Sequence, residues 1–110
     1  MDRARSSDPT GVGDPAPATP PASVARFFRH GTLPVMPRRL ADRDRVLAYV
    51  ASRTLPVDDP VGERALTLRL AELTRDPVGL RRALVDAGLV TRTRDGAEYW
   101  RTRVTEFDAL

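Results

Sequence analysis

Arginine side chains carry most of the chemistry that this sequence offers. All eighteen cationic residues are arginine, and none is lysine. Guanidinium groups make paired hydrogen bonds to phosphate oxygens and to the edge of guanine. Several arginines fall in the stretch LRRALVDAGLVTRTRDGAEYW at residues 80–100. Because the base composition of a genome can by itself favour arginine codons, the positions of these arginines decide their meaning, not their number.

Residue types that perform catalysis or hold metals are sparse. The chain has no cysteine and one histidine, His30, at a predicted helix end where a capping role is typical. Asp58 and Asp59 are the one adjacent acidic pair, and they lie in a loop bounded by prolines, where turn residues are common. No glycine-rich phosphate loop or Ser/His/Asp set is visible. We therefore expect no enzymatic activity, no cofactor and no bound metal.

Charge and composition divide the 110 residues into three parts. Residues 1–23 contain five of the ten prolines and only two large apolar residues, so we expect a disordered Pro/Gly-rich tail. Residues 24–103 contain sixteen arginines and ten carboxylates, a net charge of +6, and are expected to fold as one domain. Residues 104–110 carry a net charge of −2 and are expected to form an acidic C-terminal tail.

The sequence predicts no membrane association. The first residues lack the apolar core of a signal peptide, and no apolar run is long enough to span a bilayer. The absence of cysteine rules out disulfides. We expect a cytoplasmic protein.

The first half of the domain predicts one short and one long helix. Ser23 is expected to cap a helix over residues 24–30 that ends at Gly31. Residues 31–37 hold two prolines and are expected to be extended, in the manner of an edge strand. Residues 38–55 predict a strong helix, with Asp42, Arg45 and Tyr49 facing solvent and a buried side formed by Leu40, Leu47, Val50, Ala51 and Thr54.

Two more helices follow a loop that has a brief strand at its end. Residues 63–74 predict a helix with a buried stripe of Leu66, Leu70 and Leu73. The next helix has the clearest boundaries, because Asp76 suits the N-cap, Pro77 the first turn and Gly88 the left-handed stop. Its buried stripe is formed by Leu80, Ala83, Leu84 and Ala87.

Residues 89–102 predict a two-stranded hairpin. The Asp95–Gly96 dipeptide is the strongest short signal for a two-residue hairpin turn. This turn places Thr91 opposite Trp100, Arg92 opposite Tyr99 and Thr93 opposite Glu98. Tyr99 and Trp100 point to opposite faces, and which of them is buried stays open. For Trp100, packing against the helices is favoured over stacking on a base.

Three consecutive helices followed by a hairpin form the layout of a winged helix-turn-helix. We therefore expect a mainly α single domain with a small β-hairpin. In this layout the third helix enters the major groove of DNA, and the hairpin contacts phosphate or the minor groove.

The predicted nucleic-acid contacts are arginines of the third helix, the hairpin and the start of the long helix. Arg82 points away from the Leu80 stripe, so it can reach a nucleic acid or pair with Asp86. Arg81 lies on the flank of the helix, where it can instead bind a carboxylate or backbone group inside the fold. The full candidate set is Arg38, Arg39, Arg81, Arg82, Arg92, Arg94 and Arg101.

A protein-interaction module is the alternative function. Leu68 lies about half a turn from the buried stripe of its helix and needs a cover from the first helix or from a second chain. Together with Phe27 and Phe28 it could bind a second copy or a partner regulator without direct DNA contact.

The ordered blocks of the sequence resemble the bacterial domain of unknown function 2087. The resemblance covers residues 27–102 and implies a winged-helix fold in the context of transcription regulation. Its longest blocks run from Leu80 to Arg92 and from Asp95 to Arg101. The earlier elements are Phe27–Phe28, Gly31–Thr32–Leu33, Pro37–Arg38–Arg39, Val46–Leu47 and Glu63.

The sequence departs from the pattern of that family in three places. Asp42 and Asp44 interrupt the basic run after the proline, Arg75 stands where an acid is common, and residues 63–67 read ERALT where E-x-E-V-N is typical. A contact made by the missing carboxylate and amide would be altered in this chain. We expect a small DNA-binding winged-helix protein that acts in transcription regulation.

Overall fold

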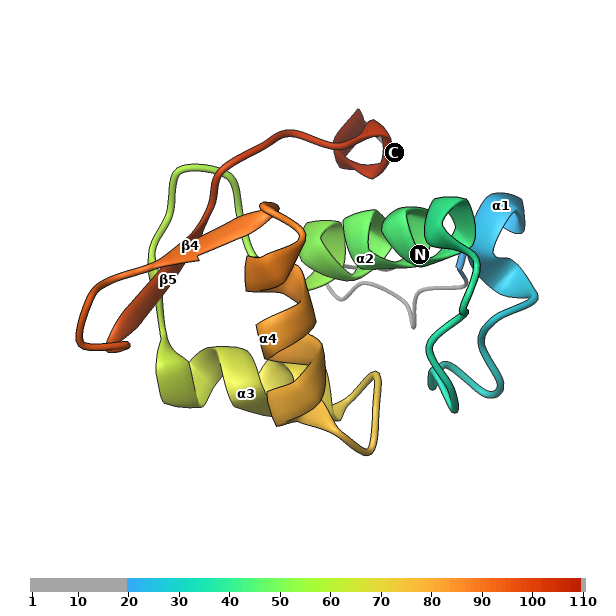
Figure 1. Ribbon diagram of the computed structural model, residues 1–110, viewed down its shortest axis with the longest axis horizontal. Coiled ribbons are helices and arrows are strands. Elements are labelled where there is room, and N and C mark those ends of the chain that lie inside the picture. Colours follow the sequence, from blue (N-terminus) through green and yellow to red (C-terminus); the bar gives the residue numbers. More distant parts are fainter. Residues whose placement is uncertain (1–19, 110) are drawn as a thin grey trace, which may run out of the picture.

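The computed structural model describes residues 20–109, so the predicted disordered tail at residues 1–23 lies almost entirely outside the described residues. In chain order the elements are α1 (Ala22–Ala25), α2 (Leu40–Thr54), β3 (Val61–Gly62), α3 (Glu63–Ala71), α4 (Pro77–Asp86), β4 (Val90–Arg92), β5 (Glu98–Arg101) and the 3-10 helix η1 (Glu106–Ala109). Figure 1 shows α1 and the β4–β5 hairpin at opposite ends of the long axis. Within residues 20–109, no helix has the length and apolar character needed to cross a bilayer.

The first helix, α1, differs from the prediction at both ends. Pro21 occupies the N-cap position in place of Ser23, and the regular helix ends at Ala25. Left-handed backbone at His30 and Gly31, with φ of 53° and 82°, then reverses the chain. The turn at Gly31 is therefore confirmed, whereas the helix before it is shorter than predicted.

The extended segment after α1 forms two isolated bridges, Thr32 with Arg29 and Leu33 with Thr74, and does not join the sheet. The Leu33 N–H donates to the Leu73 carbonyl at 2.6 Å, and Leu33 pairs in parallel with Thr74. The prediction of an extended segment is confirmed, and its partner is the turn between α3 and α4 instead of a strand edge.

The long helix α2 has a wider buried face than its sequence pattern predicts. Leu40 is 71% exposed at the start of the helix, and Tyr49 is only 3% exposed, so both assignments were wrong. Tyr49 is buried because Phe28 and Phe107 pack edge-on against its ring, with centroids at 5.4 and 5.6 Å. The remaining predicted core positions, Leu47, Val50, Ala51 and Thr54, are buried.

Helix α4 follows the prediction closely, whereas α3 ends at Ala71, three residues before the predicted end, and Leu73 lies beyond it and is half-buried. Leu66 and Leu70 of α3 are fully buried. The Asp76 carboxylate accepts a hydrogen bond from the Gly79 N–H at 3.0 Å, which caps α4. Gly88 adopts φ of 77° directly after α4, as the left-handed stop requires.

The three strands form an antiparallel sheet in the order β3–β5–β4. The register places Thr91 opposite Trp100 and Arg92 opposite Tyr99, as predicted. Tyr99 faces the core and is 2% exposed, whereas Trp100 is half-buried on the other face. The residue that packs on the helices is therefore Tyr99 and not Trp100.

The hairpin turn is shifted by one residue from the predicted position. The Gly96 N–H donates to the Thr93 carbonyl at 2.9 Å, so Arg94 and Asp95 are the central residues of the turn. Gly96 follows them with φ of 75°. The glycine is needed for this left-handed position, which explains why Asp–Gly still marks the hairpin.

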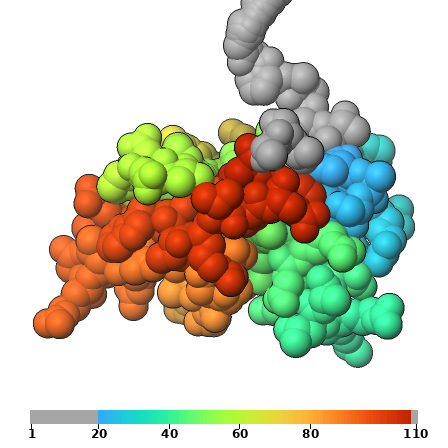
Figure 2. Space-filling model, turned by 90° about the horizontal axis from the view of Figure 1, so that it is seen from above, coloured from blue at the N-terminus to red at the C-terminus, as the bar shows by residue number. Residues whose placement is uncertain are grey.

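The C-terminal residues pack against the domain, which differs from the predicted separate tail. Phe107 of η1 is 6% exposed and belongs to the same core as α2. Figure 2 shows this segment in red, lying across one face between the orange hairpin and the green α2. The packed region therefore extends beyond residue 103.

The fold is a mainly α domain with a small β-sheet, as expected. The elements run in the order α2, β3, α3, α4, β4, β5, and β3 pairs with the hairpin through β5. Helices α3 and α4 pack on each other and on α2, and the hairpin extends to one side (Figure 1).

Candidate nucleic-acid interface

The outer face of α4 and strand β4 border one surface hollow. Its volume is about 280 Å³. The lining side chains come from the start of α3, from α4 and from the hairpin, and they are Glu63, Arg81, Arg82, Val85, Asp86, Arg92 and Tyr99. Three of them are arginines and two are carboxylates, so the hollow carries a net positive charge.

Arg81 binds inside the fold, as its position on the flank of α4 suggested. Its guanidinium lies 3.3 Å from the Glu63 carboxylate and donates to the Thr67 hydroxyl at 2.8 Å. It also lies 5.5 Å from the centre of the Tyr99 ring. With its side chain only 15% exposed, Arg81 connects α4 to α3 and to the sheet, and its charge is already compensated.

Arg82 is the arginine of α4 that faces solvent. Asp86, one turn further along the helix, is also exposed and lines the same hollow. Among the described residues no ion pair joins Arg82 to Asp86, although the i, i+4 spacing permits one. The Arg82 guanidinium is therefore available for an external acceptor.

Arg92 brings a second available cation to the hollow. Arg92 is exposed on β4. Its Nη1 lies close to Gly96, 3.1 Å from the position that a Cβ would occupy on that glycine. The guanidinium therefore lies along the hairpin beside the turn. Arg82 and Arg92, which are ten residues apart in the sequence, both line this hollow.

Arg94 is exposed at the centre of a well-ordered turn. The Thr93 hydroxyl donates to the Asp95 carboxylate at 2.7 Å, and the Ala97 N–H donates to the same carboxylate at 3.0 Å. These two hydrogen bonds hold the pKa of Asp95 below its ordinary value. The side chain of Asp95 is thereby occupied within the turn, and Arg94 projects from a fixed backbone.

Arg101 does not lie on the surface, which corrects its inclusion in the candidate set. Its side chain has no exposed area, and it forms an ion pair with Asp108 of η1. Its Nε and Nη1 atoms are buried without a hydrogen-bond partner. Position 101 faces inward because it follows Tyr99 by two residues on β5, and alternate residues of a strand share a face.

Arg38 and Arg39 are exposed, but they lie far from the hollow. They precede α2, whose first turn is at the end of the molecule opposite to the hairpin in Figure 1. The structure therefore brings Arg82 and Arg92 to one hollow, places Arg94 at the hairpin turn outside that hollow, and leaves Arg38 and Arg39 as a separate basic pair.

The three residues of the predicted protein-contact surface do not form one surface. Phe28 is buried against Tyr49, and Phe27 is half-buried with the Arg26 guanidinium 4.4 Å from its ring centre. Leu68 is 60% exposed on α3, and α1 does not lie over that helix in Figure 1.

Glu63 and Thr67 are partners of Arg81 that the sequence pattern did not reveal. Both lie on α3, one turn apart, and Arg81 lies on α4. Pairing rules for residues of one helix give no signal for a contact between two helices. An acidic residue at the start of α3 was nevertheless visible in the sequence.

The remaining polar candidates are dispersed. His30 is exposed in the turn after α1, and Asp58 and Asp59 are exposed in the loop before β3. Across residues 20–109, no group of three or more His, Cys, Asp or Glu side chains is placed to hold a metal ion.

Comparison with known proteins identifies a family for this chain. Residues 32–101 match the family described as "Uncharacterized protein conserved in bacteria (DUF2087)". No curated protein and no solved structure matches the chain significantly. The matched range contains the hollow and all of its lining residues, whereas η1 lies beyond it.

Proposed function

We propose that this chain, which belongs to the uncharacterized bacterial family DUF2087, is a cytoplasmic DNA-binding protein that acts in transcription regulation. The observation that supports the proposal best is the meeting of Arg82 and Arg92 at one hollow. They come from two separate elements, and neither has an ionic partner among the described residues.

The relation between α4 and the hairpin suits double-stranded DNA. In helix-turn-helix proteins the second helix of the pair lies in the major groove, and here that helix is α4. Arg82 on its outer face would reach a base edge, and Arg92 and Arg94 on the hairpin would contact the adjacent phosphates.

The carboxylates near the hollow limit the expected affinity. Glu63 is already paired with Arg81, but Asp86 is exposed beside Arg82 and would repel phosphate. We therefore expect moderate binding that depends strongly on salt, because most of it would come from a few arginine–phosphate contacts.

The direct test is fluorescence anisotropy of a labelled random duplex, titrated with the full chain at low and at physiological salt. Arg82→Ala, Arg92→Ala and Arg94→Ala should each weaken binding. Loss of one phosphate contact should reduce the slope of log K against log salt by about 0.9. No binding at either salt concentration would refute the proposal.

Arg45→Ala is the matched control. Arg45 is an exposed arginine of α2 and has no place in the hollow, so its loss removes one charge without touching the proposed site. If Arg45→Ala weakens binding as much as Arg82→Ala does, the interaction is a general effect of net charge.

A protein-interaction module is the second candidate, and the exposure of Leu68 favours it. A leucine that is 60% exposed on α3 is suited to contact another chain. Size-exclusion chromatography with light scattering separates the two functions. A stable dimer that Leu68→Ser dissociates, together with no DNA binding, would support this alternative.

A further inference from the structure

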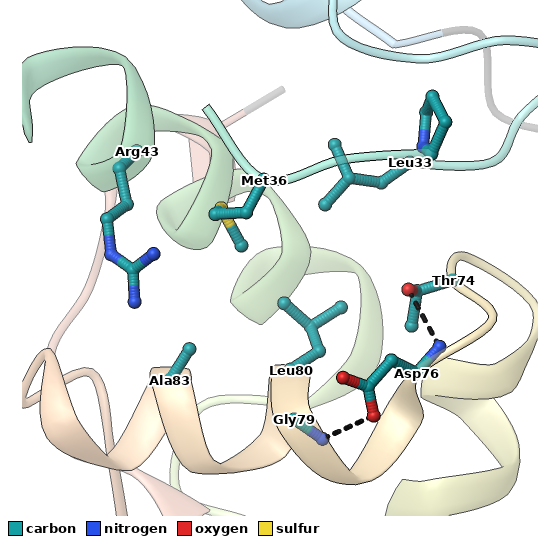
Figure 3. Close-up of a pocket in the computed structure, with 9 residues that line it drawn as sticks. Leu33, Met36, Arg43, Thr74, Asp76, Gly79, Leu80 and Ala83 are labelled. Atoms are coloured by element: carbon teal, nitrogen blue, oxygen red, sulfur yellow. Dashed lines mark hydrogen bonds between the residues drawn. The ribbon is translucent and has the colours of Figure 1, made fainter. Parts of the chain in front are cut away.

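A second hollow lies on the other side of α4, between this helix, α2 and the segment that follows α1. Its volume is about 260 Å³. Figure 3 shows Arg43 at one edge, Thr74 and Asp76 at another, and apolar side chains between them. Leu80, which lines this hollow, is two residues from Arg82 and thus on nearly the opposite side of the helix.

The apolar floor of this hollow is formed by residues of the core. Leu33, Leu80 and Ala83 are 4, 5 and 9% exposed. The hydrogen bond from the Leu33 N–H to the Leu73 carbonyl fixes the segment that forms one wall. Met36, a flexible side chain that can adapt to a ligand, lies beside it. The floor is therefore preformed.

Arg43 supplies a positive charge at one edge. Its half-buried side chain extends from α2 toward α4 in Figure 3. Among the described residues its guanidinium has no hydrogen-bond or ion-pair partner. A partly desolvated guanidinium that faces a hollow is suited to a carboxylate, which it can bind through two parallel hydrogen bonds.

Asp76 and Thr74 supply hydrogen-bond acceptors at the other edge. The Asp76 carboxylate accepts from the Gly79 N–H through one oxygen, and the Thr74 hydroxyl accepts from the Asp76 N–H at 3.1 Å. The second carboxylate oxygen of Asp76 has no partner among the described residues. It can accept a hydrogen bond from an ammonium or hydroxyl group.

Arg43 and Asp76 carry opposite charges and border the same hollow, yet no ion pair joins them within the described part of the chain. We propose that this hollow binds a small amino carboxylate whose carboxylate meets Arg43, whose ammonium meets Asp76 and whose apolar middle lies on Leu33 and Leu80. Both ends of such a ligand are charged, so each end contributes to recognition. This site shares no lining residue with the hollow of the proposed DNA contact on the outer face of α4.

The test is isothermal titration calorimetry of the full chain with 6-aminohexanoate and with its shorter and longer homologues. Hexanoate lacks the ammonium group and hexylamine lacks the carboxylate, so both should bind at least about tenfold more weakly than the best amino carboxylate. Arg43→Gln should weaken that ligand by a similar factor, whereas Arg45→Gln, an exposed position on the same helix, should not.

Asp76→Asn tests the other end of the ligand. Asparagine is as good an N-cap as aspartate, so α4 should remain capped while the negative charge is lost. Affinity for the amino carboxylate should then approach that for hexanoate, with an unchanged circular dichroism spectrum. The proposal would be overturned if no member of the series binds. It would also be overturned if hexanoate binds the wild type as tightly as the best amino carboxylate does, or if Arg43→Gln binds that amino carboxylate as tightly as the wild type does.

Discussion

Removal of the carboxylate of Asp108 should destabilise the whole domain, although this residue lies close to the end of the chain. Asp108 is the ion-pair partner of Arg101, whose side chain has no exposed area. Two nitrogens of that guanidinium already lack partners. In Asp108→Ala the charge of Arg101 would stay buried without any compensating carboxylate among the described residues.

Removal of one partner of a buried ion pair costs about 3–5 kcal/mol. The Asp108 side chain is 18% exposed, and water can enter on its side, so we expect the lower value of about 3 kcal/mol. Small domains have a total stability of roughly 5–15 kcal/mol. The melting temperature should therefore fall by about 12–24 °C.

Urea unfolding followed by circular dichroism measures the loss. Glu106→Ala is the control, because Glu106 is exposed in the same 3-10 helix and its removal should change stability by no more than about 0.5 kcal/mol. The double variant Arg101→Met, Asp108→Ala removes both charges and should regain most of the stability. A loss below about 1 kcal/mol in Asp108→Ala, or no recovery in the double variant, would show that Arg101 does not depend on Asp108.

Three further predictions concern the hairpin and helix α4. Arg81→Met should lower the free energy of unfolding by about 1–2 kcal/mol, because it removes the contacts with Glu63 and Thr67, whereas Arg82→Met should change it by no more than about 0.5 kcal/mol in the same urea experiment. In a carboxyl-detected NMR titration the pKa of Asp95 should lie below 3.8, and Thr93→Val should raise it, since the Thr93 hydroxyl is the main cause of the shift. Because folding lowers this pKa, the carboxylate of Asp95 contributes to stability above its unfolded-state pKa, and the contribution is lost as the pH falls through the folded-state pKa. A pKa of Asp95 equal to its ordinary value would contradict the turn geometry. Gly79→Ala should stabilise the protein less than an ordinary glycine-to-alanine change in a helix does, because a Cβ at that position would lie 2.2 Å from Asp76 Oδ2 and disturb the cap. Thermal unfolding measures the gain from Gly79→Ala in the wild type and in Asp76→Ala, which lacks the clashing carboxylate. An equal gain in both would show that no such clash occurs.

Local signals in the sequence predicted the elements, and contacts between distant segments account for the errors. The cap at Asp76, the stop at Gly88 and the pairing of Arg92 with Tyr99 depend on neighbouring residues, and all three were predicted. The burial of Tyr49 depends on two rings that lie 21 and 58 residues away in the sequence. No helical period of α2 contains that information.

In the candidate site, too, local signals predicted some side-chain directions, whereas a contact between distant segments decided others. The outward direction of Arg82 follows from the stripe of its own helix, so it could be predicted from residues 80–84. The inward direction of Arg101 follows from the strand alternation that buries Tyr99, and the sequence left open whether Tyr99 or Trp100 was the buried member. Once Tyr99 is known to face the core, Arg101 must face it too, and a carboxylate must come from elsewhere to meet it.

Helix α4 borders both hollows, and its rigidity decides whether they act independently. Arg82 faces outward, whereas Leu80 and Ala83 face the hollow beside Arg43. A ligand that joins Arg43 of α2 to Asp76 would restrain the start of α4 relative to α2. It could change DNA affinity only if DNA binding requires α4 to lie in a position different from the one it has in the free protein. Any factor by which the amino carboxylate changes DNA affinity must equal the factor by which DNA changes the affinity for the amino carboxylate. If α4 already has the position that DNA requires, both factors equal one, and Arg43→Gln should leave DNA binding unchanged while Arg82→Ala weakens it.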